Sequence, residues 1–350
     1  MSLNNILNTK CEWLSGDGPD CDIVLSSRIR LARNLKGIPF PNAGDYRSNN
    51  EVLEKIFRVL RKTSFFKKGL VAKLSEMSDL EKQILLERHL ISKEHLINRI
   101  ESGVAISEKQ DLSIMVNEED HMRIQVLKSG FRLDDCWELI DNVDSELEQH
   151  LDFAYSPAVG YLTACPTNVG TGMRASIMLH LPGLVLMELI NKVMQAVIKL
   201  GMTVRGFYGE GSEVLGNLFQ ISNQVTLGKS EKEIISNLNR VLNLVVEHER
   251  NSRQLMRQKN EARLQDRIGR AYGILANAHI ISSKETISLI SALRMGMDMG
   301  YINGIGGGSI NELFIVTQPA HLQQSAGELL DAETRDILRA KLIRERLKQK

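Results

Sequence analysis

The sequence predicts an α+β protein in which an antiparallel sheet flanked by helices is followed by a smaller helical domain. Short β-leaning runs recur between residues 112 and 225, and helical segments lie before and among them. Charged and amide residues become dominant after position 247, which marks a junction between two units. The length of 350 residues supports two domains. We place them at residues 1–255 and 256–350.

Two helices are predicted between residues 51 and 89. Apolar residues recur at helical spacing over residues 51–66 and 79–89, and both segments are predicted to be amphipathic helices. Residues 112–116 and 122–127 are predicted strands with partial alternation. The polar stretch 117–121 lies between these strands, so we expect it at a hairpin connection where its side chains face a cleft.

The middle of the chain mixes strands and helices. Further strands are predicted at residues 173–181, 203–207 and 218–225, with a glycine-bearing loop between the last two. Pro182 should end the first of them. Residues 134–150 predict a helix, and residues 184–200 predict one strongly apolar helix that packs on the sheet.

A long helix is predicted to begin after Ser230, which can cap it. Apolar residues from Ile234 to Val245 recur at i, i+4, i+7 and i+11. Residues 247–263 are mostly charged or amide residues, as in a solvated helix that joins two units. We therefore place the boundary near residue 255. Further helices are predicted at residues 268–275, 286–297 and 329–347.

Composition excludes several classes of function. The chain is 43% hydrophobic and 25% charged, which is ordinary for a soluble globular protein. Its net charge of +1 creates no overall field that attracts nucleic acid or an anionic membrane. The sequence has no signal peptide and no apolar run near the roughly 20 residues that span a bilayer. We expect a cytoplasmic protein without direct nucleic-acid or membrane binding.

The cysteines predict free thiols. Cys11, Cys21, Cys136 and Cys165 are widely spaced and lack the C-x-x-C pairing of a zinc site. We therefore expect reduced cysteines and no dedicated metal site in the chain.

Two glycine-containing motifs imitate phosphate-binding loops. Gly228-Lys229-Ser230 ends like a Walker A loop, but Asn223 stands where the first glycine should be, so a helix start is favoured. Residues 304–309 are rich in glycine but lack a lysine, and we interpret them as a turn.

The first candidate for chemistry is Ser26-Ser27-Arg28-Ile29-Arg30. In an extended backbone Arg28 and Arg30 point to the same face, and two planar guanidinium forks there suit a phosphate. A pair of surface arginines in ion pairs is the alternative.

The second candidate is Asn117-Glu118-Glu119-Asp120-His121. Three acids in a row are typical of a solvated turn. Arg123 follows, however, and strand alternation lets it project beside the carboxylates. The stretch is therefore also a candidate for binding or proton transfer.

Two loops complete the set. Cys165 begins a polar, glycine-bearing loop that leads into a strand with Arg174. A lone cysteine is usually a buried apolar residue, but hydroxyls and arginines near this one could stabilise a thiolate. Residues 205–210 contain an arginine and a carboxylate in a loop that could fold over a substrate, although most such loops only connect elements.

Taken in order, residues 26–30, 117–123, 165–174 and 205–210 resemble the signature of the ATP:guanido phosphotransferases, the creatine and arginine kinase family. The resemblance implies ATP as a substrate, with Mg²⁺ carried by the nucleotide and no separate metal ligands. The ATP-binding residues it implies are Ser26, Ser27, Arg28, Ile29, Arg30, His89, Arg123, Arg174, Ala175, Ser176, Ile177, Met178, Arg205, Gly206, Phe207, Tyr208, Gly209 and Glu210. For His89 the alternative is an ordinary surface position on a helix.

The same resemblance implies three catalytic residues. Glu119 and Glu210 match the carboxylates that grip the guanidinium, and Cys165 matches the thiol beside it. A guanidinium has a pKa of about 12.5 or more, so its nitrogen becomes nucleophilic only when a carboxylate orients it and takes a proton.

Departures from that family favour a subgroup. The arginine motif begins at residue 28, which leaves no room for the helical N-terminal domain of the small-molecule kinases. Met178 stands where those enzymes have a histidine. An added helical C-terminal region resembles that of the bacterial protein-arginine kinases. Its Arg335-Asp336-Ile337-Leu338-Arg339-Ala340 resembles their R-D-x-x-R-A element, which implies a phosphoarginine pocket at Arg335, Asp336, Arg339 and Ala340. A basic helix end is the alternative.

This resemblance implies phosphorylation of exposed arginines in protein substrates, which marks those proteins for Clp-type degradation in a stress response. It also implies a homodimer or higher oligomer and three partners: a zinc-binding activator protein, a Clp chaperone ATPase and a heat-shock repressor. Two alternatives stay open. One is a phosphagen kinase that acts on free arginine or a related small guanidino compound, and the other is an inactive phosphoarginine-binding adaptor.

Overall fold

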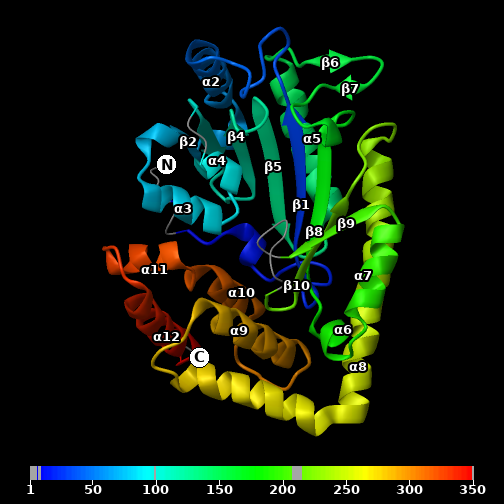
Figure 1. The fold of residues 1–350 in the computed structure, drawn as a ribbon, viewed down its shortest axis with the longest axis vertical. Helices are drawn as coiled ribbons and strands as arrows, with labels where there is room; N and C mark the ends of the chain where they lie inside the picture. Colours follow the sequence, from blue (N-terminus) through cyan, green and yellow to red (C-terminus); the bar gives the residue numbers. More distant parts are fainter. Residues whose placement is uncertain (1–5, 7–8, 98–99, 207–214, 349–350) are drawn as a thin grey trace.

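The computed structural model describes residue 6 and residues 9–97, 100–206 and 215–348, and its centre is one eight-stranded sheet (Figure 1). The strand order is β2-β3-β4-β5-β1-β8-β10-β9, and every neighbouring pair is antiparallel. The strands are β1 (Val24–Arg33), β2 (Leu70–Lys73), β3 (Gly103–Ile106), β4 (Leu112–Val116), β5 (Met122–Ser129), β8 (Met173–His180), β9 (Met202–Gly206) and β10 (Leu218–Asn223). The predicted α+β class and antiparallel sheet are confirmed.

One face of the sheet carries the main core. Apolar residues of β1, β5, β8 and β10 pack there against α5 (Leu133–Glu148), α7 (Ile190–Lys199) and the first half of α8 (Glu231–Asn277). The helix α2 (Tyr46–Leu60) closes the same core at one edge, where Phe57 is fully buried. Burial of this kind is worth about 25 cal/mol per Å² of apolar surface, so this layer holds the sheet in place.

The other face is only partly covered. Its β2–β4 end packs on α3 (Asp79–Glu87), and α4 (Lys93–Ile97) adjoins α3. A small hairpin of β6 (Tyr155–Ser156) and β7 (Gly160–Tyr161) projects beyond the strand ends at the top of Figure 1. The remaining strip of this face is left open for other groups.

Most predicted elements are found within a few residues, and two helix predictions are wrong. Residues 184–200 do not form a single helix, because α6 (Pro182–Leu186) ends before α7 begins. Glu188 has a φ of +58°, the left-handed conformation that ends a helix. Pro182 starts α6, where proline has no N–H to leave unsatisfied.

The predicted long helix is α8. Ser230 caps it, and Ser230 and Glu233 form a reciprocal capping box. The segment predicted as a separate helix at residues 268–275 is instead the second half of α8, which kinks at Asn260. Figure 1 shows this half running beneath the C-terminal helices.

The C-terminal helices are α9 (Ser283–Asp298), α10 (Gly307–Val316), α11 (Pro319–Ala326) and α12 (Ala332–Lys348). They enclose a separate apolar cluster that also takes in Leu25, Met178 and Leu218 of the sheet. The glycine run 304–309 is only partly a turn, because its last three residues begin α10. A Cβ atom on Gly308 would lie 2.4 Å from the Ser15 carbonyl oxygen, so glycine permits this close approach. In the part of the chain that the structure describes, no helix is both long and apolar enough to cross a membrane.

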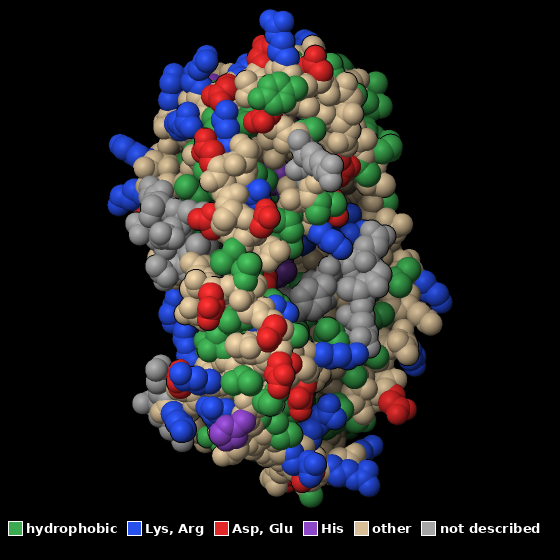
Figure 2. Space-filling model, turned by 60° about the vertical axis from the view of Figure 1, so that its left-hand side comes forward, with side chains coloured by type: hydrophobic (Ala, Val, Ile, Leu, Met, Phe, Trp, Pro, Cys, Tyr) green, Lys and Arg blue, Asp and Glu red, His purple; other side chains and the backbone are tan. Residues whose placement is uncertain are grey.

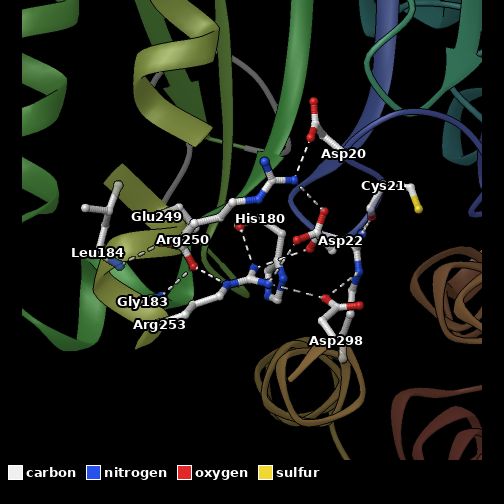
Figure 3. A network of polar contacts seen from close by, with 11 residues as sticks. Asp20, Cys21, Asp22, His180, Gly183, Leu184, Glu249, Arg250, Arg253 and Asp298 are labelled. Carbon is white, nitrogen blue, oxygen red and sulfur yellow. Dashed lines mark hydrogen bonds and ion pairs between the residues drawn. The ribbon is translucent and has the colours of Figure 1, made fainter. Parts of the chain in front are cut away.

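A buried polar network joins α8 to the sheet and to α9 (Figure 3). The Glu249 carboxylate is fully buried and accepts hydrogen bonds from the Gly183 and Leu184 N–H groups at the start of α6, at 2.8 and 2.9 Å. The Arg253 guanidinium lies 2.7 Å from Glu249 and 3.7 Å from Asp298 of α9. Burial raises the pKa of the Asp298 carboxyl to about 6, although Arg294 and Arg253 oppose the shift.

Replacing Glu249 with alanine should lower the free energy of unfolding by about 3–5 kcal/mol, because Arg253 would remain buried without its closest carboxylate. Urea denaturation measures this change. Arg250→Ala is the matched control on the same helix, since Arg250 is half-exposed and its pairing with Asp20 should contribute less than about 1 kcal/mol. Equal losses in the two variants would contradict the assigned role of Glu249.

Candidate active site

Five arginines share the open face of the sheet. In an antiparallel sheet, two directly paired residues point to the same face. Along one strand, every second residue points to that face again. Arg30 pairs with Arg174, and Ala32 pairs with Arg123. Arg28 pairs with Ser176, and the same row of β8 and β10 leads to Arg205 through Gln220. The prediction that Arg28 and Arg30 point the same way is therefore confirmed.

A cavity of about 650 Å³ lies over the part of this row formed by Arg28, Arg30 and Arg205, whereas Arg123 and Arg174 are not among its lining residues. It is lined by Trp13, Ser26, Arg28, Arg30, Leu86, Glu87, His89, Ile91, Ser92, Lys93, Glu94, Met115, Gln125, Leu127, Ser176, Met178, Arg205, Gln220, Ile315 and Gln318. Figure 2 shows a hollow at mid-height on this side of the molecule, with charged side chains around it.

The arginines at the centre of the row have mostly neutral partners. Arg28 donates to the Gln220 side-chain oxygen at 2.8 Å and to the Ser176 hydroxyl at 3.3 Å. Within the described ranges, no carboxylate forms an ion pair with Arg28 or Arg30, so the surface-ion-pair interpretation is wrong. Burial, together with repulsion from the neighbouring Arg123, Arg174 and Arg205, lowers the pKa of Arg28 to about 10.

Arg30 is affected more strongly. Burial lowers its pKa well below the usual value, and repulsion from Arg28 and Arg123 adds to the shift. Its Nε atom is buried and has no hydrogen-bond partner in the described structure. An anion with several oxygens would relieve both the repulsion and the missing hydrogen bond.

The acidic stretch forms the predicted β4–β5 hairpin connection, but it is not a solvated turn. Asn117, Glu118, Asp120 and His121 are at most 3% exposed. Asn117 adopts a φ of +56° and donates from its amide to the Asn49 and Glu101 carbonyls. Asparagine tolerates this left-handed conformation better than most residues.

Asp120 and His121 fasten this turn to its surroundings. Asp120 accepts hydrogen bonds from Asn34 at 2.6 Å and from the Ala164 N–H at 2.7 Å. His121 accepts the Leu35 N–H at Nδ1, and its Nε2 lies 2.9 Å from the Pro39 carbonyl. The Asp120–Ala164 bond places the turn beside the loop that begins at Cys165.

Glu118 and Glu119 hold Arg123 between them. The Arg123 guanidinium lies 2.5 Å from Glu118 and 3.2 Å from Glu119. Glu118 also accepts the Ser92 hydroxyl. The sequence did not single out Glu118, although the alternation that points Arg123 toward the carboxylates could have identified it.

Glu119 and Cys165 come together as predicted. The Cys165 thiol adjoins the Glu119 carboxylate, and its sulfur lies 2.9 Å from the Thr167 hydroxyl. Burial raises the pKa of Glu119, Arg123 lowers it, and the charges of Asp120 and Glu118 raise it. A carboxylate that is half-buried beside a thiol can bind a cation and accept its proton.

His89 lies in the cavity and not on a helix surface. It follows the end of α3 with a φ of +58°, and its ring meets Trp13 edge-on at 5.3 Å between centroids. Burial, together with the nearby charge of Arg28, lowers the pKa of His89 to about 3. The imidazole is therefore neutral at physiological pH.

Several predicted ATP-binding side chains do not reach the cavity. Alternation turns Ile29, Ala175 and Ile177 into the core behind the sheet. Ser27 also points away, and its hydroxyl donates to the Gly130 carbonyl at 2.7 Å. Met178, which replaces a histidine in the motif, does line the cavity.

The last predicted group falls mainly outside the described residues. Glu210 lies there together with Phe207, Tyr208 and Gly209. Gly206 ends β9, where it pairs with Phe219.

The predicted phosphoarginine residues lie on α12, away from the cavity. Arg339 is 1% exposed and donates to the Thr317 and Ile281 carbonyls at 2.8 and 2.9 Å, as well as to Asp336. Arg335 is half-exposed and donates to the Leu330 carbonyl. Ala340 is buried in the C-terminal cluster. Arg339 is thus engaged with backbone oxygens, while Arg335 is more accessible.

Sequence reasoning missed several cavity residues. Gln125 and Gln220 could have been found, because period-two alternation puts them on the arginine face. Trp13, Ile315 and Gln318 come from distant segments, and no local pattern identifies them.

The family comparisons agree with this geometry. Residues 51–252 match the ATP:guanido phosphotransferase C-terminal catalytic domain, and residues 261–350 match the protein-arginine kinase McsB C-terminal domain. The chain is 48% identical to a protein-arginine kinase of Halothermothrix orenii over 99% of both chains. It is 46% identical to one of Bacillus mycoides over 99% of both chains.

Solved structures share the fold. Lombricine kinase superposes with a TM-score of 0.59 at 25% identity, covering 67% of this chain and 68% of that one. The substrate-free duplicated taurocyamine kinase from Schistosoma mansoni has the same TM-score at 22% identity, covering 82% of this chain and 41% of that one.

Glu118→Gln should shift the acid limb of the pH–activity profile to lower pH. The substitution removes a charge that raises the pKa of Glu119 and leaves Arg123 to pair with Glu119 alone, so both effects lower that pKa. A base works above its pKa, so the active range extends further into acid. Turnover at neutral pH should fall about tenfold, because Arg123 loses its closer anchor.

Turnover measured across pH tests this assignment. Glu108→Gln, at an exposed turn, is the control and should leave the profile unchanged. An acid limb that stays in place or moves to higher pH in the Glu118 variant would contradict it.

Proposed function

This chain belongs to the ATP:guanido phosphotransferase family, and from its full-length likeness to protein-arginine kinases we infer that it phosphorylates arginine side chains of proteins with ATP. One structural observation supports phosphoryl transfer to a guanidinium in this chain. A carboxylate and a thiol, Glu119 and Cys165, meet next to a face lined by five arginines. The first pair suits a guanidinium, and the arginines suit a polyphosphate.

The reaction follows from this arrangement. The arginine face holds the ATP phosphates and stabilises the charge on the transferring group. Glu119 orients the substrate guanidinium and accepts one of its protons as a nitrogen bonds to the γ-phosphorus. The bond between that phosphorus and the bridging oxygen breaks, and ADP leaves with the bond's electron pair. We assign Glu210 as the second carboxylate of the grip, from the motif alone.

Arg123 has a second role in this proposal. It is bound by Glu118 and Glu119, so it connects the guanidinium site to the phosphate site. Arg123 lies between the two carboxylates and separates the negative charge of Glu119 from the other arginines of the row. Glu118 is therefore a positioning residue, because it acts through Arg123.

The cofactor proposal is Mg²⁺ carried by the nucleotide. An oxygen-rich polyphosphate suits this ion, and the arginine-lined cavity suits the polyphosphate. When bound, the ion would neutralise phosphate charge that the arginines do not reach.

We also propose the finer features that the resemblance implies. The catalytic unit covers residues 1–255 and the helical unit residues 256–350, a division supported by matches that end at 252 and begin at 261. Arg335, Asp336, Arg339 and Ala340 form a phosphoarginine pocket, and the protein assembles as a homodimer or higher oligomer. It acts in the cytoplasm, where its four free cysteines stay reduced.

The proposed biological role is a stress response in which phosphoarginine marks proteins for Clp-type degradation. A zinc-binding activator protein, a Clp chaperone ATPase and a heat-shock repressor are the proposed partners. These partners rest on the family resemblance only.

Incubation with magnesium ATP and either an unfolded protein or free arginine tests the function. Mass spectrometry under non-acidic conditions should find acid-labile phosphate on protein arginines. Phosphate on free arginine alone would indicate a phosphagen kinase, and none on either substrate would favour an inactive adaptor.

Glu119→Ala should lower turnover by at least about a hundredfold, because it removes both the guanidinium contact and the proton acceptor. Glu148→Gln, at the exposed end of α5, is the control and should retain full turnover. Substantial turnover in the Glu119 variant would show that another group acts as the base.

A further inference from the structure

Two segments that lie outside both the sheet and the catalytic match of residues 51–252 complete the wall of the cavity. Trp13 precedes β1 in a short 3₁₀ helix, and Ile315 and Gln318 lie where α10 meets α11. All three line the same cavity as the arginine row. The C-terminal helices therefore contribute side chains to a site that the catalytic sheet builds.

The residues along β1 change in character from one end to the other. Toward its C-terminal end, Arg30 pairs with Arg174, and the strand leads to the turn that holds Glu119. Toward its N-terminal end, Leu127 pairs with Arg28, and Met178 pairs with Ser26. The Arg30 end is next to the guanidinium grip. The Ser26 end lies farther from it, beside the apolar side chains of Leu127 and Met178, and we call it the apolar end.

Trp13 and Ile315 lie at the apolar end. Both are 2% exposed and belong to one apolar cluster with Leu127 of β5. The Trp13 ring also meets His89 edge-on. These side chains make the wall apolar at this end of the cavity, and an apolar wall suits a purine ring.

Trp13 also has a polar atom without a partner. Its indole Nε1 is buried, and no residue in the described ranges accepts its hydrogen. A buried donor without an acceptor costs free energy, so an acceptor supplied by a bound ligand would stabilise this end of the cavity.

Hydrogen bonds from the end of α3 to the start of α11 fix the α10–α11 corner beside the cavity. We call this set, formed by Glu87 and Arg88 with Ala320 and His321, the Glu87–His321 latch. Glu87, the last residue of α3, accepts the Ala320 and His321 N–H groups at 2.8 and 3.1 Å. These N–H groups lie in the first turn of α11, where a carboxylate is favourable.

The His321 ring strengthens the latch. Arg88 donates from Nε to His321 Nε2 at 3.1 Å, so the ring proton lies on Nδ1, which donates to Glu87 at 2.6 Å. Glu87 lines the cavity itself and is two residues from His89. A shift of α11 would therefore move Glu87, which is part of the cavity wall.

We propose that Trp13 and the α10–α11 corner form the seat for the base of the adenine nucleotide, with Ile315 and Gln318 as nucleotide-positioning residues held by the Glu87–His321 latch. The proposal rests on the proposed function, because it takes the arginine row as the phosphate site. It makes the C-terminal unit part of the ATP site, so nucleotide affinity depends on that unit being docked.

Trp13 fluorescence reads this contact directly. The chain has two tryptophans, and Trp137 on α5 does not line the cavity, so a Trp137→Phe background isolates the Trp13 signal. ADP should change that signal on titration. In the same background, Ile315→Ala and Gln318→Ala should each weaken ADP binding by about fivefold.

Turnover separates positioning from chemistry. In the full chain both variants should raise the KM for ATP by a similar factor while kcat stays within about twofold. His321→Ala should do the same, because it removes the ring's bonds to Glu87 and Arg88 and so weakens the latch without removing a cavity-lining side chain. Ile337→Ala, an exposed truncation on α12, is the matched control and should leave ADP affinity unchanged.

Wild-type ADP affinity in folded Ile315→Ala and Gln318→Ala would overturn the proposal, as would a loss confined to kcat. Thermal melting establishes whether each variant is folded. If Ile315→Ala does not fold, Gln318→Ala alone still tests the proposal. A failure of the proposed function would look different. The wild-type chain would then phosphorylate no arginine, while ADP binding would still be measurable by fluorescence.

Discussion

The rest of the site depends on the repulsion among arginines on one face of a β-sheet. Backbone pairing fixes the register, so Arg28, Arg30 and Arg174 cannot separate without breaking the ladder between β1 and β8. Burial and mutual repulsion lower the pKa values of Arg28 and Arg30. The apolar layer behind the sheet supplies the stability that tolerates this arrangement. The free enzyme is thus organised for a polyanion that it does not itself contain.

Arg123 shows how the protein limits this positive field. Glu118 and Glu119 bind it on the side toward the hairpin turn, so the field ends where a cationic substrate must enter. Asp120 and His121 use their hydrogen bonds to hold the turn, which leaves Glu119 as the accessible carboxylate beside Cys165. The strand register holds the arginine face, and the hydrogen bonds of Asp120 and His121 hold the turn that carries Glu119. The positive and negative sites can therefore lie side by side. A guanidinium and a polyphosphate can therefore bind next to each other.

The sequence predicted those parts of the site that follow from local periodicity. The α+β class, the β4–β5 hairpin and the shared face of Arg28 and Arg30 all follow from alternation over a few residues. The break between α6 and α7 was missed because apolar residues continue through it, and only the left-handed Glu188 marks it. The wall formed by Ile315 was missed because it depends on how the C-terminal helices dock, which no local pattern encodes. The buried state of Arg339 has the same cause, since its carbonyl partners are tertiary neighbours.

The stability of an Arg30→Met variant, measured by urea unfolding with and without ADP, tests the central claim most directly. The account predicts that the variant without ligand is more stable than wild type by about 1–2 kcal/mol, because a buried repulsive charge is replaced by an apolar side chain. It also predicts that ADP stabilises the variant far less than wild type, because one phosphate contact is lost. A variant that is less stable without ligand, and that ADP stabilises as strongly as wild type, would contradict the account.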